Sequence, residues 1–199
     1  MYPFFETIRY QNAVADKLQL HQHRLENTFL HFGRVPVLDL MRIDFKKEAE
    51  KNGALRDCVY KTKVSYDLLG NYHISFEPYS IRTINTFTLF DIGSNDYSIK
   101  FTDRVWINNA LKSVTTDEVI FVKDGFLKDA SYANIVLFDG YNWVTPSNPL
   151  LLGTYRALLL NEKKIIEKPI TIDQLKDHKR LKFINAMMLW DESPIIDLS

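Results

Sequence analysis

The sequence is poor in cysteine and has no excess of charge of either sign. Its single cysteine, Cys58, can form neither an intrachain disulfide nor a cysteine-rich metal centre, so we predict no metal site and expect a reducing compartment. Lysine plus arginine number 25 and aspartate plus glutamate also number 25, giving a net charge of zero. Nucleic-acid binding needs a basic surface to neutralise phosphates, and here only a local basic patch could supply one. We therefore expect no nucleic-acid partner.

Long hydrophobic segments are also missing. No apolar run approaches the roughly 20 residues that a membrane-spanning helix requires. The N-terminal segment MYPFFETIRYQN lacks the basic region, the apolar run and the small-residue cleavage site of a signal peptide. These absences predict a cytoplasmic protein that does not associate with membranes.

What the sequence does contain is enough apolar material for a substantial core. Of its 199 residues, 46% are hydrophobic, which suffices for one large domain or two small ones. Strand-like segments occur in runs that look antiparallel, with helices grouped between them, and this pattern favours an α+β fold. A soft boundary near residues 79–84 divides a small N-terminal α/β domain, 1–80, from a larger strand-rich C-terminal domain, 81–199.

Periodicity and turn residues predict the individual elements. We expect strands at 4–9 and 17–20, a helix from His21 to Gly33 and a second helix from Pro36 to about Lys51. A hairpin follows at 57–79, then a helix at 103–114 and several strands punctuated by Asp-Gly pairs. Another helix is expected to begin near Gly153 and Thr154, before a final alternation of strands and a helix.

Several polar residues stand at the ends of these elements, and each alone has an ordinary structural explanation. Lys100 would be a solvated charge, and Arg24 a helix-surface arginine. Asp129 would be a turn residue that bonds its own backbone. The segment LLGTYR at 151–156 would be an empty helix start, although the free N–H groups of a helix start can hold a phosphate.

The order and spacing of these residues indicate that they belong to one functional site. Lys100 is followed by DG-x-x-x-D-x-x-x-x-N at 124–134, TP at 145–146 and LxGTxR at 151–156. FETIR at 5–9 and HxxRL at 21–25 precede them, and INAM at 184–187 comes after them. This series, which covers nearly the whole chain, resembles the class IV aminotransferases, the fold-type IV enzymes that use pyridoxal 5′-phosphate (PLP). Within that family, KFTDR and NAMM are most similar to 4-amino-4-deoxychorismate lyases.

The resemblance implies roles for three residues near the reactive part of the cofactor. Lys100 matches the lysine that binds PLP covalently and then moves a proton, a role that a lysine can fill when burial lowers its pKa. Asp129 matches the acid that faces the pyridine nitrogen and keeps it protonated. The family normally has glutamate there, and aspartate is one methylene shorter. Asn134 is expected to order the turn that positions Asp129.

The resemblance implies that five further residues surround the phosphate. Arg24 matches the phosphate-binding arginine, whose forked donors suit that group. Thr154 and Tyr155 match the pair whose backbone N–H groups hold the phosphate at a helix start. Family members often have threonine where this chain has Tyr155. Asn185 and Ala186 match a second loop on the phosphate side.

The implied fold is the two-domain fold of D-amino acid and branched-chain aminotransferases. Because the sequence begins almost at FETIR, the N-terminal domain is expected to be truncated, without a hairpin that usually helps to form the substrate pocket. The leading functional interpretation is a homodimeric lyase of folate biosynthesis that acts on a small amine, converting 4-amino-4-deoxychorismate to 4-aminobenzoate and pyruvate. An aminotransferase acting on branched-chain or D-amino acids, and a catalytically silent PLP-binding or interaction protein, are the alternatives.

Overall fold

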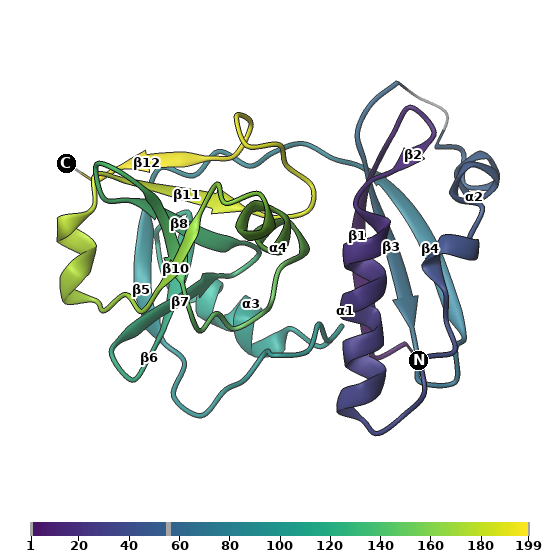
Figure 1. Cartoon of the computed structure of the whole chain (residues 1–199), viewed down its shortest axis with the longest axis horizontal. Coiled ribbons are helices and arrows are strands. Elements are labelled where there is room, and N and C mark those ends of the chain that lie inside the picture. The colour runs from purple at the N-terminus through teal and green to yellow at the C-terminus, as the bar shows by residue number, and fades with distance from the viewer. Residues whose placement is uncertain (1, 55–56, 199) are drawn as a thin grey trace. The chain divides into compact units, whose positions relative to one another are not determined.

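Two units with separate hydrophobic cores make up the chain in the computed structural model, which describes residues 2–54 and 57–198 (Figure 1). The first unit contains the residues up to Ser80 together with Ile99–Asp103. The second contains Ile81–Ser98 and the residues from Arg104 onward. Strands and helices occur in both units, which confirms the predicted α+β class.

A four-stranded antiparallel sheet with the order β2-β1-β3-β4 forms the centre of the first unit. Alternate side chains of β3 are buried, as expected for a strand with one face against a core. Helix α1 supplies Leu25 and Phe29 to that core, where both are fully buried. The elements of this unit are β1 (Phe4–Gln11), β2 (Val14–Ala15), α1 (Leu18–His31), the 3-10 helix η1 (Leu40–Arg42), α2 (Phe45–Lys51), β3 (Tyr60–Tyr66) and β4 (Tyr72–Pro78).

Two predictions for this unit were wrong in detail. The strand expected at 17–20 is the start of α1, because the chain turns at Asn12 and Ala13, both with positive φ, and pairs back already at 14–15. The helix expected from Pro36 to Lys51 is broken into η1 and α2. The carboxylates of Asp39 and Asp44 cap these two helices separately, accepting hydrogen bonds from the backbone N–H groups of Met41 and Lys47.

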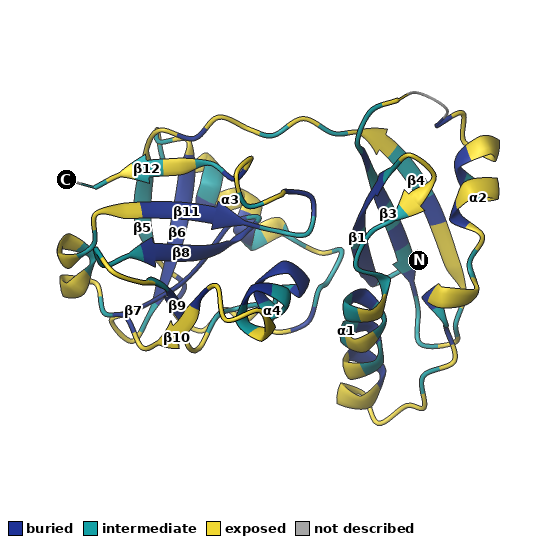
Figure 2. Cartoon of the chain, turned by 45° about the horizontal axis from the view of Figure 1, so that its top comes forward, coloured by how far each residue is buried: buried dark blue, intermediate teal, exposed yellow. Residues whose placement is uncertain are grey.

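The second unit contains a three-stranded sheet, β5-β6-β7, and a five-stranded sheet, β10-β9-β8-β11-β12. Both sheets contribute to one core, and Figure 2 shows β8 and β11 as largely buried. Its elements are β5 (Phe87–Asp91), α3 (Val105–Lys112), β6 (Glu118–Lys123), β7 (Phe126–Ala130), β8 (Asn134–Phe138), β9 (Trp143–Pro146), α4 (Thr154–Asn161), β10 (Ile166–Lys168), the 3-10 helix η2 (Asp173–Asp177), β11 (Arg180–Ile184) and β12 (Ile195–Asp197).

Two strand pairs of this unit are parallel, although the sequence suggested antiparallel runs. β5 pairs with β6, and β9 with β10. Parallel neighbours need a crossover connection, and α3 and α4 lie in the two crossovers. The second crossover places the start of α4 directly after the loop that leaves β9.

The predicted division of the chain needs one correction. The sequence assigned all of 81–199, including Lys100, to the C-terminal domain, whereas Ile99–Asp103 belongs to the first unit. Backbone pairing with β1 explains the difference. The N–H of Phe5 donates to the carbonyl of Lys100 at 3.2 Å, and the N–H of Thr102 donates to the carbonyl of Pro3 at 2.8 Å.

Within the described ranges, none of the helices combines the length and the apolar character that crossing a membrane would require.

Candidate active site

A buried carboxylate organises the polar residues of the first unit. Glu6 on β1 is fully buried, and His21 and Arg24 lie three residues apart on α1, hence on one face of that helix. The Nε and Nη2 of Arg24 donate to the two carboxylate oxygens of Glu6 at 2.9 and 2.5 Å. The Nδ1 of His21 lies 2.6 Å from Glu6 Oε2. Arg24 is therefore held in a fixed orientation by a forked ion pair.

Glu6, His21 and Arg24 determine one another's protonation states. Burial acts to raise the pKa of Glu6, but the charge of Arg24 and the hydrogen bonds from His21 and Arg24 outweigh it and lower that pKa to about 2. Burial lowers the pKa of His21, against the opposing effect of Glu6. Near neutral pH the group is thus a neutral imidazole, a carboxylate and a guanidinium.

Lys100 lies beside β1, the strand that carries Glu6. Its backbone is joined to β1 through Phe5, and its Nζ lies 4.7 Å from the centroid of the Phe5 ring. Its charge also contributes to the lowered pKa of His21. The structure therefore brings the predicted cofactor lysine and the predicted phosphate-binding arginine to neighbouring positions along β1, at Phe5 and Glu6.

The remaining six predicted residues belong to the second unit. Among them, Asp129 and Asn134 are joined by a hydrogen bond between their side chains. Asp129 is the next-to-last residue of β7 and Asn134 the first of β8, and both side chains are buried. The Nδ2 of Asn134 donates to Asp129 Oδ1 at 2.7 Å and to the carbonyl of Leu151 at 2.9 Å. The N–H of Leu151 donates to Asp129 Oδ2 at 2.8 Å. Asn134 thus joins the β7–β8 turn to the loop before α4.

Asp129 has an unusual proton affinity. Burial raises its pKa to about 6, although the N–H of Leu151, the amide of Asn134 and the charge of Arg156 all favour the ionised form. A carboxylate in this position would be stabilised further by a cationic partner. A protonated ring nitrogen is such a partner.

Gly153, the N-cap of α4, allows the loop to approach Asn134 closely. A Cβ built on Gly153 would lie 1.9 Å from Oδ1 of Asn134, so no larger residue fits without displacing that amide. No side chain caps this helix start. In the described part of the chain, the buried Oγ1 of Thr154, the first residue of the helix, has no hydrogen-bond partner. An unpartnered hydroxyl at an uncapped helix start suits an anion such as a phosphate.

The other three predicted residues differ in what their side chains can contribute. The side chain of Tyr155 packs in an apolar cluster with Val136 and Leu159, so its backbone is the part suited to bind a ligand. Asn185 and Ala186 directly follow β11, whose Ile184 pairs with Asn134. This register places the loop at 185–186 at the same strand ends as the β7–β8 turn.

Sequence reasoning missed the importance of three residues. The motifs FETIR and HxxRL contain Glu6 and His21 but indicate no role for them, and LLGTYR indicates only that Gly153 stands at a helix start. An acid in an apolar strand, followed by a histidine and an arginine three residues apart, was the signal for a buried ion pair. The sequence held no comparable signal for the tight contact between Gly153 and Asn134.

Comparison with known proteins gives the family. The family model described as amino-transferase class IV matches residues 92–191, which includes Lys100, Asp129 and the start of α4. The chain therefore belongs to the class IV aminotransferases. Membership of this family indicates a PLP-dependent enzyme, either a lyase or an aminotransferase.

Individual relatives match along nearly the whole chain. A Haemophilus somnus protein of known structure, named as a proposed 4-amino-4-deoxychorismate lyase, is 34% identical, with a TM-score of 0.81 over 94% of this chain and 97% of its own. An uncharacterised protein of Haemophilus influenzae is 30% identical over 94% of this chain and 98% of its own length. A hypothetical aminotransferase of Mycobacterium tuberculosis, in a PLP-bound form, shares the fold with a TM-score of 0.79, at 17% identity over 98% of this chain and 80% of its own.

Proposed function

We propose that this protein binds PLP and acts as a lyase that converts 4-amino-4-deoxychorismate to 4-aminobenzoate and pyruvate. The observation that carries the lyase assignment is the 34% identity to the Haemophilus somnus protein, which is named as a proposed lyase of this kind and matches almost end to end. The family carries the cofactor assignment. An uncapped helix start and a buried acid of raised pKa give it local support.

The residues of the chain suit the parts of PLP. The resemblance to the family assigns phosphate binding to Arg24, which Glu6 holds in place in the first unit, and, within the second unit, to the start of α4 at Gly153–Tyr155 and the loop of Asn185 and Ala186. Asp129 would face the pyridine nitrogen. As a carboxylate it would keep that nitrogen protonated, and the positive ring would in turn hold the pKa of Asp129 below its present value of about 6.

The proposed chemistry depends on one mobile proton. When bound, PLP supplies an electron sink for the substrate carbon that carries the amine. Lys100 would hold PLP covalently, and its amine, when free, would accept the proton from that carbon. The neighbouring C–O bond then breaks, which makes the ring aromatic and gives 4-aminobenzoate, and the enolpyruvate that leaves takes up a proton to become pyruvate. Because no amino group is transferred, the cofactor leaves the reaction unchanged.

An aminotransferase is the second candidate, because the same lysine serves both reactions and the Mycobacterium tuberculosis protein shares the fold. The two are separated by supplying purified protein with PLP and 4-amino-4-deoxychorismate, without a keto acid. A lyase forms pyruvate and 4-aminobenzoate in equal amounts over many turnovers. An aminotransferase forms neither under these conditions and becomes active only when a keto acid is added to an amino acid.

Lys100→Ala is the control for this assay, and pyruvate formation should be lost in that variant. Pyruvate formation that survives in Lys100→Ala would assign it to a contaminant. The silent alternative predicts PLP binding without either reaction.

The proposal includes a homodimer in the cytoplasm. A two-fold symmetric dimer is the commonest oligomer geometry, and the resemblance to the family suggests it. The cytoplasmic location rests on the sequence, with its single cysteine. Light scattering at micromolar concentration should give twice the 23.3 kDa mass of the chain, and a monomer would contradict the dimer.

A further inference from the structure

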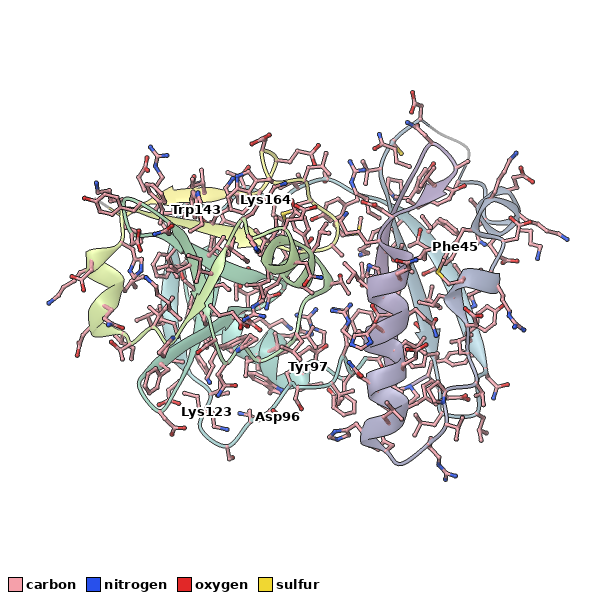
Figure 3. The ribbon with its side chains drawn as sticks, in the orientation of Figure 1. Phe45, Asp96, Tyr97, Lys123, Trp143 and Lys164 are labelled. Carbon is pink, nitrogen blue, oxygen red and sulfur yellow. The ribbon has the colours of Figure 1, made fainter. Side chains whose placement is uncertain are left out.

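A cavity of about 320 Å³ lies in the second unit, at the end of the β6–β7 hairpin. Lys123, which Figure 3 labels, ends β6 and lines this cavity together with Lys128 of β7. Its volume falls in the range of small-ligand sites, which begins at about 300 Å³. The other lining residues come from three segments: Asp124, Phe126 and Leu127; Pro146, Ser147 and Asn148; and Pro169 and Ile170.

Lys128 is the unusual residue of this cavity. It is only 6% exposed, and its Nζ donates to the carbonyl of Asn148 at 2.9 Å. An ammonium group has three donors. Among the described residues, that carbonyl is the one hydrogen-bond partner of the Nζ, so its two other N–H groups have no acceptor in this part of the protein. Burying a charge is costly unless it is paired, and an acceptor in the cavity would reduce that cost.

The charges around Lys128 favour an anion in the cavity. Burial lowers the pKa of Lys128, and the charge of Lys123 lowers it further, while Asp124 and Asp129 act in the opposite direction. In the described part of the chain, neither Lys123 nor Lys128 forms an ion pair with a carboxylate. The lining contains two lysines and one aspartate, so its formal charge is +1.

The walls of the cavity are fixed by backbone hydrogen bonds. The N–H of Leu127 donates to the backbone carbonyl of Ile170 at 2.8 Å, and the N–H of Ser147 donates to the backbone carbonyl of Lys168 at 2.9 Å. The parallel ladder of β9 and β10 ends at Pro146 and Lys168, and the next residue, Pro169, has no N–H to extend it. The opening is thus formed by the fold itself, which reduces the cost of ordering it on binding.

We propose that this cavity binds a small carboxylate with an apolar body, with Lys128 as the principal donor. The carboxylate would accept from Lys128 and Lys123, while Phe126, Pro146 and Ile170 contact the apolar part. Lys128 donates to the carbonyl of Asn148, whereas Asp129 accepts from Asn134 and Leu151, and neither Asp129 nor Asn134 lines the cavity. The proposed site is therefore separate from the Asp129–Asn134 contact, and it does not depend on the proposed function.

The test is a calorimetric titration of the full chain with sodium benzoate. Wild type should bind one benzoate per chain. Lys128→Met removes the charge and shortens the unbranched side chain by one atom, and it should weaken binding about ten- to a hundredfold, as expected for loss of a charge-assisted hydrogen bond. Because the charge is buried without a carboxylate, the variant should fold at least as well as wild type. Lys123→Gln, at a partly exposed position, should weaken binding less and provides a second measurement.

Three comparisons make the result specific. Lys176→Met, at an exposed lysine outside the cavity, should leave the affinity unchanged. Benzamide, the neutral analogue, should bind at least tenfold more weakly than benzoate, and inorganic phosphate should not compete at equal concentration. Lys100→Ala should bind benzoate like wild type. Absence of benzoate binding at millimolar concentration, equal affinity in Lys128→Met, or loss of binding in Lys100→Ala would overturn the proposal.

Discussion

Asn134 holds Asp129 through a 2.7 Å hydrogen bond between two buried side chains, and the second hydrogen bond of the same amide goes to the carbonyl of Leu151. Because both N–H groups of the amide have acceptors, the amide has one sensible orientation, with its oxygen toward Gly153. The acid is thereby fixed to the loop before α4. This relationship joins the proposed ring-nitrogen contact to the proposed phosphate site.

Asp129→Asn should retain PLP binding and lose most of its turnover. The substitution preserves the shape of the side chain but removes the charge that would keep the ring nitrogen protonated. Steady-state kinetics and a PLP titration on the same preparation measure the two effects. Unchanged turnover in a variant that binds PLP would show that Asp129 does not face the ring nitrogen.

Asp129→Glu tests whether the shorter acid is matched to this backbone. The hydrogen bonds from Asn134 and Leu151 fit aspartate, so the longer side chain should displace them and lower turnover. Higher turnover in the glutamate variant would instead mean that aspartate is a weakened contact, which favours the silent alternative.

Gly153→Ala should disturb the same network from the other side. The new Cβ would meet Oδ1 of Asn134 at 1.9 Å, which forces the amide or the helix start to move. We expect a loss of about 1–3 kcal/mol in the free energy of unfolding, as for other overpacked sites. PLP affinity should also fall. Leu152→Ala, at the exposed neighbouring residue, is the matched control and should change neither quantity greatly. A Gly153→Ala protein as stable as wild type would contradict the close contact.

Glu6→Gln should destabilise the protein in a pH-dependent way. In the folded state the pKa of Glu6 is about 2, below its ordinary value of 4.5, so its contribution to stability is present above pH 4.5 and is lost as the pH falls toward 2. The shift corresponds to a contribution on the order of 3 kcal/mol at pH 7. Urea unfolding at pH 7 and pH 3 should therefore show a large difference between wild type and variant at pH 7 and a smaller one at pH 3.

The control for this prediction is Glu77→Gln. Glu77 pairs with Lys61 on the surface, where an ion pair is worth no more than about 1 kcal/mol. A loss of equal size at both pH values in Glu6→Gln would indicate a packing defect rather than the loss of a paired carboxylate.

Arg24→Ala should weaken PLP binding about ten- to a hundredfold, the effect of losing one charge-assisted contact. Arg42→Ala is the matched control, because the side chain of Arg42 is 87% exposed and pairs with Asp39 alone among the described residues. Fluorescence titration with PLP measures both affinities. If Arg24→Ala bound PLP as wild type does, the ion pair with Glu6 would be a purely structural feature of the first unit.

The sequence was sufficient for the family, the α+β class and most of the strands and helices. The family could be identified because six short motifs occur along the chain in the order typical of that family. Local patterns identified β1, β3 and α1: alternate residues of β3 are buried, α1 buries Leu25 and Phe29 at helical spacing, and β1 is buried along most of its length. Local patterns could not show that β5 pairs in parallel with β6, because that pairing depends on the crossover and not on either strand alone.

The contacts within the site were less predictable. That Ile99–Asp103 belongs to the first unit follows from backbone pairing with β1, which side-chain patterns do not reveal. The burial of the Tyr155 side chain in the core likewise depends on packing with Val136 and Leu159. The partner of Arg24 could have been anticipated, because Glu6 is an acid within an apolar strand.

The central claim is that Lys100 binds PLP, and the most direct test is to identify the modified lysine. Protein saturated with PLP is reduced with borohydride, digested and mapped by mass spectrometry, with Lys100→Ala treated in parallel. We predict one pyridoxyl adduct, on Lys100, accompanied by loss of the cofactor's absorbance band in the variant. An adduct on another lysine such as Lys128, or no adduct in PLP-saturated protein, would contradict the account.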